Sequence, residues 1–170
     1  MKKNRDLIYG ISSGLAVCAF VFVQYLLGYH SDKIGDSRII NYFGMLIPIT
    51  FISIGIIQRK KAQEGWLELK DGMKTGILIT FITGIITTVF MLIYNKYINP
   101  EFINVAMAYE NKLLTEAGKK PEEIAAIIEQ FKAGQALSAQ LFSGLVGTPL
   151  MGMIPTLIIT LILRKSRNQM

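Results

Sequence analysis

The chain has 170 residues, and its 18 Lys and Arg against 12 Asp and Glu give a formal net charge of +6. Apolar residues make up 51% of the chain and charged residues 18%, whereas an ordinary soluble domain carries about 25% charged residues. The apolar residues lie in four long uncharged runs, and there is one cysteine. This composition argues against a soluble domain, a disordered chain and a disulfide-stabilised scaffold.

Each of the four uncharged runs can cross a membrane, because the hydrocarbon core requires about 20 apolar residues in a helix. We place the spans at residues 7–29, 39–58, 75–95 and 141–163. In lipid the backbone has to satisfy its own hydrogen bonds, so an uninterrupted apolar run becomes a helix. The sequence therefore predicts an all-α membrane protein, with residues 1–170 forming one membrane domain of four transmembrane helices.

The basic N-terminus, Lys2-Lys3-Asn4-Arg5, followed by an apolar run, has features of a signal peptide. The run is longer than a typical signal-peptide core and lacks a clear small-residue cleavage site. We therefore expect it to be retained as the first span. Cys18 within it is expected to be a small apolar packing residue.

Lys and Arg are concentrated in the N-terminus, the connection between the second and third spans, and the C-terminus. Those that directly follow the second and fourth spans, and are expected at the cytoplasmic membrane surface, are Arg59, Lys60, Lys61, Arg164 and Lys165. The positive-inside rule then places both termini in the cytoplasm. Such charges also attract anionic lipid, at roughly 1 kcal/mol each, and a partner or phosphate site around Arg59 is an alternative role.

Small residues recur every four positions in three of the spans, and this spacing keeps them on one helix face. They are Gly10 and Gly14 in the first span, Gly72, Gly76, Thr80, Gly84 and Thr88 entering and within the third, and Gly144, Thr148, Gly152 and Thr156 in the fourth. Membrane helices associate through such small-xxx-small faces. We expect these faces to form the seams of a four-helix bundle, with a homodimer face as the alternative for one of them.

Two spans contain an internal proline, Pro48 in the second and Pro155 in the fourth. A proline removes one helix hydrogen bond and tends to kink the helix. Their similar contexts also suggest a duplicated helical hairpin. The prolines are predicted to be packing kinks, and gating hinges of a transporter are the alternative.

The connection between the third and fourth spans, residues 99–132, is predicted to hold an external helical hairpin. Asn99-Pro100-Glu101 has the pattern of a helix start and Gly118 of a helix end. A second helix is predicted from Pro121, continuing into the fourth span. Its apolar face is formed by Ile124, Ile127, Ile128 and Phe131. The hairpin is expected to cap the bundle or rest on the membrane, and docking of an envelope protein is the alternative.

The chain lacks the residue clusters that catalysis usually requires. Its single histidine, His30, and single cysteine lie far apart in sequence, and no phosphate-loop or zinc-binding motif is present. We therefore assign no catalytic, metal or cofactor-binding residue and no cofactor. The basic residues follow membrane topology, so no nucleic acid is expected as a partner.

The whole chain resembles a family of bacterial four-helix integral membrane proteins of unknown function. The matching segments are Lys2-Lys3 before the first span, Gly44-Met45, Arg59-Lys60-Lys61, Leu69-Lys70-Asp71-Gly72-Met73-Lys74-Thr75-Gly76, Tyr94-Asn95-Lys96-Tyr97-Ile98-Asn99-Pro100-Glu101-Phe102, and Arg164-Lys165 after the last span. The resemblance implies a multi-pass protein of the bacterial inner membrane. It implies no activity, cofactor or catalytic residue.

Two functions remain open at this stage. The first is a non-enzymatic scaffold or accessory subunit of an envelope complex, favoured by the small-residue faces and the long external segment. The second is a small carrier or lipid-handling protein, favoured by the paired prolines. Membrane lipids are expected partners in both cases, together with a membrane or envelope protein or a second copy of the chain.

Overall fold

The computed structural model describes residues 5–165, so the predicted N-terminal charges Lys2 and Lys3, and Arg167 at the other end, lie outside the described residues. The described elements are helical, and two short segments are π-helices, labelled η. In order they are α1 (Arg5–Leu26), α2 (Ile34–Ala62), α3 (Leu69–Ile93), η1 (Tyr94–Ile98), α4 (Phe102–Glu116), α5 (Pro121–Gly134), α6 (Leu137–Phe142), η2 (Ser143–Gly147) and α7 (Thr148–Leu163).

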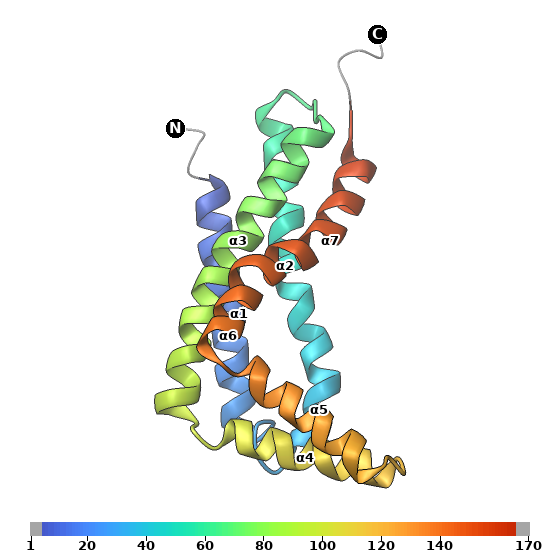
Figure 1. Ribbon diagram of the computed structural model, residues 1–170. Coiled ribbons are helices and arrows are strands. Elements are labelled where there is room, and N and C mark those ends of the chain that lie inside the picture. Colours follow the sequence, from blue (N-terminus) through green and yellow to red (C-terminus); the bar gives the residue numbers. More distant parts are fainter. Residues whose placement is uncertain (1–4, 166–170) are drawn as a thin grey trace.

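Four continuous helical segments of the described chain are long and apolar enough to cross a membrane: Arg5–Leu26, Ile34–Ala62, Leu69–Ile98 and Leu137–Leu163. They run along one another, and α4 and α5 lie across one end (Figure 1). We call this the hairpin end. The opposite, basic end holds the start of α1, the α2–α3 connection and the end of α7. The predicted class, a helical protein with four potential membrane-spanning helices, is confirmed.

The first two helices differ in length from the apolar runs that predicted them. The first, α1, ends at Leu26, and Gly28 follows it with a positive φ of 82°. This left-handed conformation stops a helix and suits glycine. By contrast, α2 extends beyond its apolar run at both ends. Its first turn contains Asp36 and its last turn Arg59, Lys60 and Lys61, and charges of these signs stabilise the two ends of a helix dipole.

Two details predicted for the third connection are wrong. Asn99 is not a helix cap, because α4 begins at Phe102 and the Asn99 side chain donates to the Tyr94 hydroxyl instead. The helix from Pro121 also does not run into the last span. It ends at Gly134, and Ala136 adopts an extended backbone before α6 begins at Leu137. Gln140 then donates its side-chain amide to the Gln135 carbonyl, 2.7 Å away, across this break.

At the centre of the bundle, α3 packs against α1, α2 and α7. The small residues of α3 lie opposite those of the last helix in alternating pairs: Gly72 with Thr160, Gly76 with Thr156, Gly152 with Thr80, Gly144 with Thr88, and Gly84 with Thr148 and the Gly144 backbone. On the other side of α3, Gly10 and Gly14 of α1 contact Ile82 and Ile86. In each pair a glycine makes room for a branched side chain, so the backbones approach closely.

The two internal prolines lie within helices, Pro48 in α2 and Pro155 in α7, and α2 and α7 are neighbours. The last span also contains two features that the periodicity did not indicate. The π-helix η2 interrupts it at Ser143–Gly147, and Pro149 follows in the first turn of α7. A π-helical turn is a recognised cause of helix bending.

Candidate functional site

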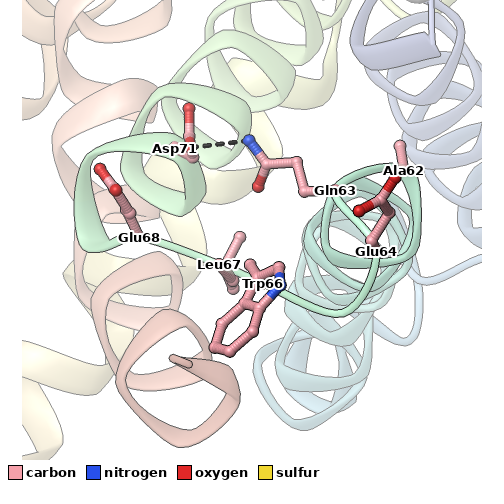
Figure 2. A pocket seen from close by; sticks show the side chains of 7 residues that line it. All are labelled: Ala62, Gln63, Glu64, Trp66, Leu67, Glu68 and Asp71. Carbon is pink, nitrogen blue, oxygen red and sulfur yellow. Dashed lines mark hydrogen bonds between the residues drawn. The ribbon is translucent and has the colours of Figure 1, made fainter. Parts of the chain in front are cut away.

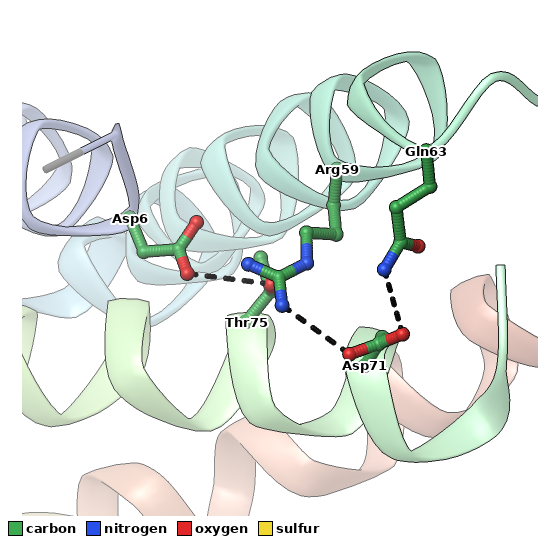
Figure 3. Close-up of polar contacts among 5 residues, drawn as sticks. All are labelled: Asp6, Arg59, Gln63, Asp71 and Thr75. Carbon is green, nitrogen blue, oxygen red and sulfur yellow. Dashed lines mark hydrogen bonds and ion pairs between the residues drawn. The ribbon is translucent and has the colours of Figure 1, made fainter. Parts of the chain in front are cut away.

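Polar side chains at the basic end form a network that joins three helices. Asp71 of α3 accepts a hydrogen bond from Arg59 Nη2 at 3.2 Å and one from Gln63 Nε2 at 2.8 Å. Nearby, Thr75 of α3 donates to Asp6 of α1 at 3.4 Å. Figure 3 shows the Arg59 guanidinium lying between the two carboxylates. This network ties α1, α2 and α3 together where they emerge from the apolar part of the bundle.

Arg59 has a different environment from the basic residues that follow it in the sequence. Its guanidinium points to Asp71, and its Nε atom is buried with no hydrogen-bond partner among the described residues, whereas Lys61 is exposed. The pocket of about 260 Å³ next to it is lined by Arg5 and Asp6 of α1, by Arg59 and further residues of α2, and by Gln63. Because the Arg59 guanidinium is already paired with Asp71 and the lining also contains the Asp6 carboxylate, the pocket is not a strong anion site.

The end of α7 is held to the α2–α3 connection by backbone and side-chain contacts. Leu67 and Lys165 exchange two backbone hydrogen bonds, of 3.0 and 3.1 Å. The Lys165 ammonium also lies 4.9 Å from the centre of the Trp66 ring, close enough for a cation–π contact. Beside these residues is a pocket of about 330 Å³ whose lining includes Glu64, Glu68 and Asp71 (Figure 2). Lys165 therefore fixes the chain in addition to its predicted role at the membrane surface, and Arg164 precedes it at the end of α7.

A second, more buried polar network occupies the hairpin end. His30, in the turn between α1 and α2, is 5% exposed. Its Nδ1 lies 2.5 Å from the Tyr94 hydroxyl and its Nε2 lies 3.1 Å from Gln24 Oε1. The Gln24 amide in turn donates to Asn41 of α2, and Asn99 donates to Tyr94. Five side chains thus connect α1, the α1–α2 turn, α2 and η1.

This network is satisfied when His30 is neutral. Since Gln24 uses its NH₂ group to donate to Asn41, its oxygen accepts a hydrogen from His30 Nε2. His30 Nδ1 then accepts the Tyr94 hydroxyl hydrogen. Phe102 of α4 packs against the imidazole, with ring centres 4.5 Å apart, and burial lowers the pKa of His30. Both ring nitrogens of His30 are hydrogen-bonded to other side chains of the protein, so the network has a structural role in connecting these helices.

The sequence reasoning missed this network because its members are scattered over the chain. A usable signal was present, since Gln24 is the one side-chain amide within the first apolar run and Asn41 is one of two within the second. Polar groups at membrane depth usually face the bundle interior and have a partner. His30, Tyr94 and Asn99 carry no such signal, because a sequence does not show that their three segments meet.

The hairpin is attached to the bundle mainly through α4. Arg38 of α2 pairs with Glu110 at 3.2 Å, with both groups partly solvent-exposed, and Tyr109 contacts Gly35. The second helix, α5, has no buried residue among those that the structure describes. Its predicted apolar residues Ile124, Ile127, Ile128 and Phe131 are half-buried. Ile124 and Ile128 line a pocket of about 810 Å³ that they share with Asn111 and Thr115 of α4.

These features define a class, a helical membrane protein whose bundle centre is joined by small residues and whose ends are joined by polar networks. Comparison with known protein families places it further. The chain matches the family described as Protein of unknown function (DUF4199) over residues 8–165 and belongs to that family. Neither the curated proteins nor the solved structures include one that matches it.

Proposed function

We propose that the protein is a multi-pass protein of the bacterial inner membrane, with the basic end in the cytoplasm and the α4–α5 hairpin outside. The distribution of positive charge supports this orientation. Arg59, Lys60 and Lys61 close α2, and Arg164 and Lys165 follow α7. All lie at the end of the bundle opposite the hairpin (Figure 1), and positive residues near span ends favour the cytoplasmic side.

Its role in this proposal is that of a non-enzymatic scaffold or accessory subunit of an envelope complex. The observation that carries the proposal is the unequal anchoring of the hairpin. The first helix, α4, is fixed to the bundle by Phe102 against His30 and by the Arg38–Glu110 ion pair. The second helix, α5, presents exposed Glu122, Glu123 and Gln130. A polar helix that is carried by an anchored neighbour and is itself left uncovered suits an external protein partner.

Site-specific photo-cross-linking in cells tests this role. A photoreactive residue replacing Gln130 on the exposed face of α5 should give one cross-linked product of constant mass, and the same protein should co-purify in a fixed ratio. Replacement of Leu150, an exposed side chain of α7 that would face lipid, is the matched control and should give none. A protein that purifies alone and gives no α5 adduct refutes the scaffold role.

Lipid handling is the second candidate, and one observation favours it. Between α3 and the α6–η2 segment lies a pocket lined by hydroxyl and amide side chains. Uncharged polar groups in this position suit a neutral solute or lipid better than an ion. Vesicles reconstituted with the protein should then move a neutral lipid between leaflets faster than protein-free vesicles, and equal rates would refute this candidate.

A further inference from the structure

The uncharged pocket has a volume of about 280 Å³. None of the described residues that line it is charged. Its polar lining residues include Thr87, Thr88, Asn95, Gln140, Ser143 and Thr148. Because no lining group offers a formal charge, the pocket suits an uncharged ligand with several hydrogen-bonding groups.

One polar group of the lining, the side-chain carbonyl of Asn95, has no hydrogen-bond partner in the described part of the chain. Its Oδ1 atom is buried. An unsatisfied buried acceptor is costly, and each such group in a native structure calls for an explanation. A donor supplied by a ligand in the pocket would satisfy it. The hydroxyl groups of Thr88 and Thr148 donate to backbone carbonyls of their own helices, so their lone pairs remain available to accept hydrogens.

Each of the two main walls of the pocket contains a π-helical segment next to α-helical residues. Asn95 belongs to η1, and Ser143 and Gly144 belong to η2. Single π-helical turns are rare in proteins as a whole, but those that occur are often located at functional sites. The contact of Gly144 with Thr88 also brings the two backbones close together. Two such distortions on opposite walls of one pocket are a second observation, independent of the unpaired acceptor.

The position of the pocket indicates which ligand reaches it. Thr87 and Asn95 lie about 12 Å apart along the helix at 1.5 Å per residue, in the part of the third span nearest the hairpin end. In a bilayer this is the boundary between headgroups and acyl chains. We propose that the pocket binds the uncharged, hydroxyl-bearing headgroup of a membrane lipid, such as a glycerol or sugar group, with Asn95 Oδ1 accepting a hydroxyl hydrogen.

This inference rests on the second candidate function, lipid handling, and names the class of lipid that it would concern. The full chain in phosphatidylcholine nanodiscs, with monogalactosyldiacylglycerol as the probe, tests it by native mass spectrometry of the lipid that remains bound. The galactolipid should be retained in preference to phosphatidylcholine and to the anionic phosphatidylglycerol. The Asn95→Leu variant should weaken retention about fivefold, the usual effect of losing one hydrogen bond.

The matched control is Asn104→Leu, which changes an exposed amide of α4 outside the pocket and should leave retention unchanged. Thermal stability without the probe separates binding from folding. Because Asn95 Oδ1 has no protein partner, Asn95→Leu should be at least as stable as the parent. Equal retention of all three lipids, or equal effects of the two variants, overturns the proposal. Displacement of the galactolipid by millimolar glycerol overturns the lipid assignment in favour of a free polyol.

The same preparations distinguish the site from the transport role. Selective, Asn95-dependent retention without faster movement of the lipid between leaflets supports the site and refutes lipid handling. Faster movement that Asn95→Leu does not change supports lipid handling and overturns the site.

Discussion

The contact between Gly76 and Thr156 offers a direct test of how the helices are held together. A Cβ added at Gly76 would lie 2.8 Å from Thr156 Cβ and closer still to the two outer atoms of that side chain. Thr156 is fully buried, so it has little room to move away. The Gly76→Ala substitution therefore has to push α3 and α7 apart or shift Thr156 from its position.

The expected cost follows from two opposing terms. Overpacking a well-packed contact typically costs 1–3 kcal/mol, whereas alanine in place of glycine within a helix gains about 1 kcal/mol. Because the added Cβ would meet three atoms of Thr156 at less than 3.0 Å, the overpacking cost should lie in the upper part of that range, about 2–3 kcal/mol. We therefore expect Gly76→Ala to lower the free energy of unfolding by roughly 1 to 2 kcal/mol. For a protein of this size each kcal/mol corresponds to about 2–4 °C, so the midpoint should fall by roughly 2 to 8 °C.

The protein carries its own reporter for this assay. Cys18 is the only cysteine and is buried in α1, so a thiol-reactive fluorogenic dye reports thermal opening of the bundle in detergent. Gly134→Ala is the matched control, because a Cβ there meets nothing within 4 Å, and its midpoint should be unchanged or higher.

A swap of the two side chains sharpens the test. Gly76→Thr alone should destabilise, and Gly76→Thr with Thr156→Gly should recover most of the loss, since the branched side chain then sits on the other helix. Equal midpoints for Gly76→Ala and Gly134→Ala, or a double variant as unstable as the sum of its parts, would refute the packing argument.

Three further predictions concern the polar ends and the orientation. Because the pKa of His30 is lowered in the folded protein, the unfolded chain binds more protons. Stability should therefore fall as the pH drops below about 6.5, by at most ~1.4 kcal/mol per pH unit, and His30→Gln should flatten this part of a melting-point profile. Asp71→Asn removes the carboxylate that accepts from Arg59 and Gln63 and should cost about 1–2 kcal/mol in the same assay, while the exposed Glu68→Gln should cost less. In a Cys18→Ala background, an impermeant thiol reagent added to intact cells should label Gln130→Cys and leave Glu64→Cys unlabelled, and the reverse result would invert the proposed orientation.

The sequence predicted those parts of the fold that depend on local composition. An apolar run in lipid can only be a helix, so the four spanning segments followed from length and hydropathy. The exact ends did not, because they depend on conformations such as the positive φ of Gly28 and on charged turns that prolong α2. The break at Ala136 was missed for the same reason, since the surrounding Ala- and Ser-containing residues are compatible with a continuous helix.

The candidate sites were less predictable, because they are built from residues that only tertiary contacts bring together. The His30 network draws on four separate segments of the chain, and Lys165 meets Leu67 across most of the sequence. The π-helices η1 and η2 could not be predicted either, because no characteristic amino-acid composition distinguishes a π-helical turn from an α-helical one. The pairing of Gly72 with Thr160 and of Gly152 with Thr80 is likewise invisible in either helix alone, although each stripe is visible by itself.

The distribution of these contacts argues that stability is uneven along the bundle. The centre is joined by glycine–threonine pairs, the basic end by the Asp71 network and the hairpin end by the His30 network, which reaches as far as Phe102 of α4. None of these contacts extends to α5, which has no buried residue among those described. Helices with few buried contacts open at low free energy, so α5 should exchange its amide hydrogens faster than α3. A protein partner bound to α5 would slow that exchange, whereas a lipid in the pocket beside Asn95 would leave most of α5 unprotected.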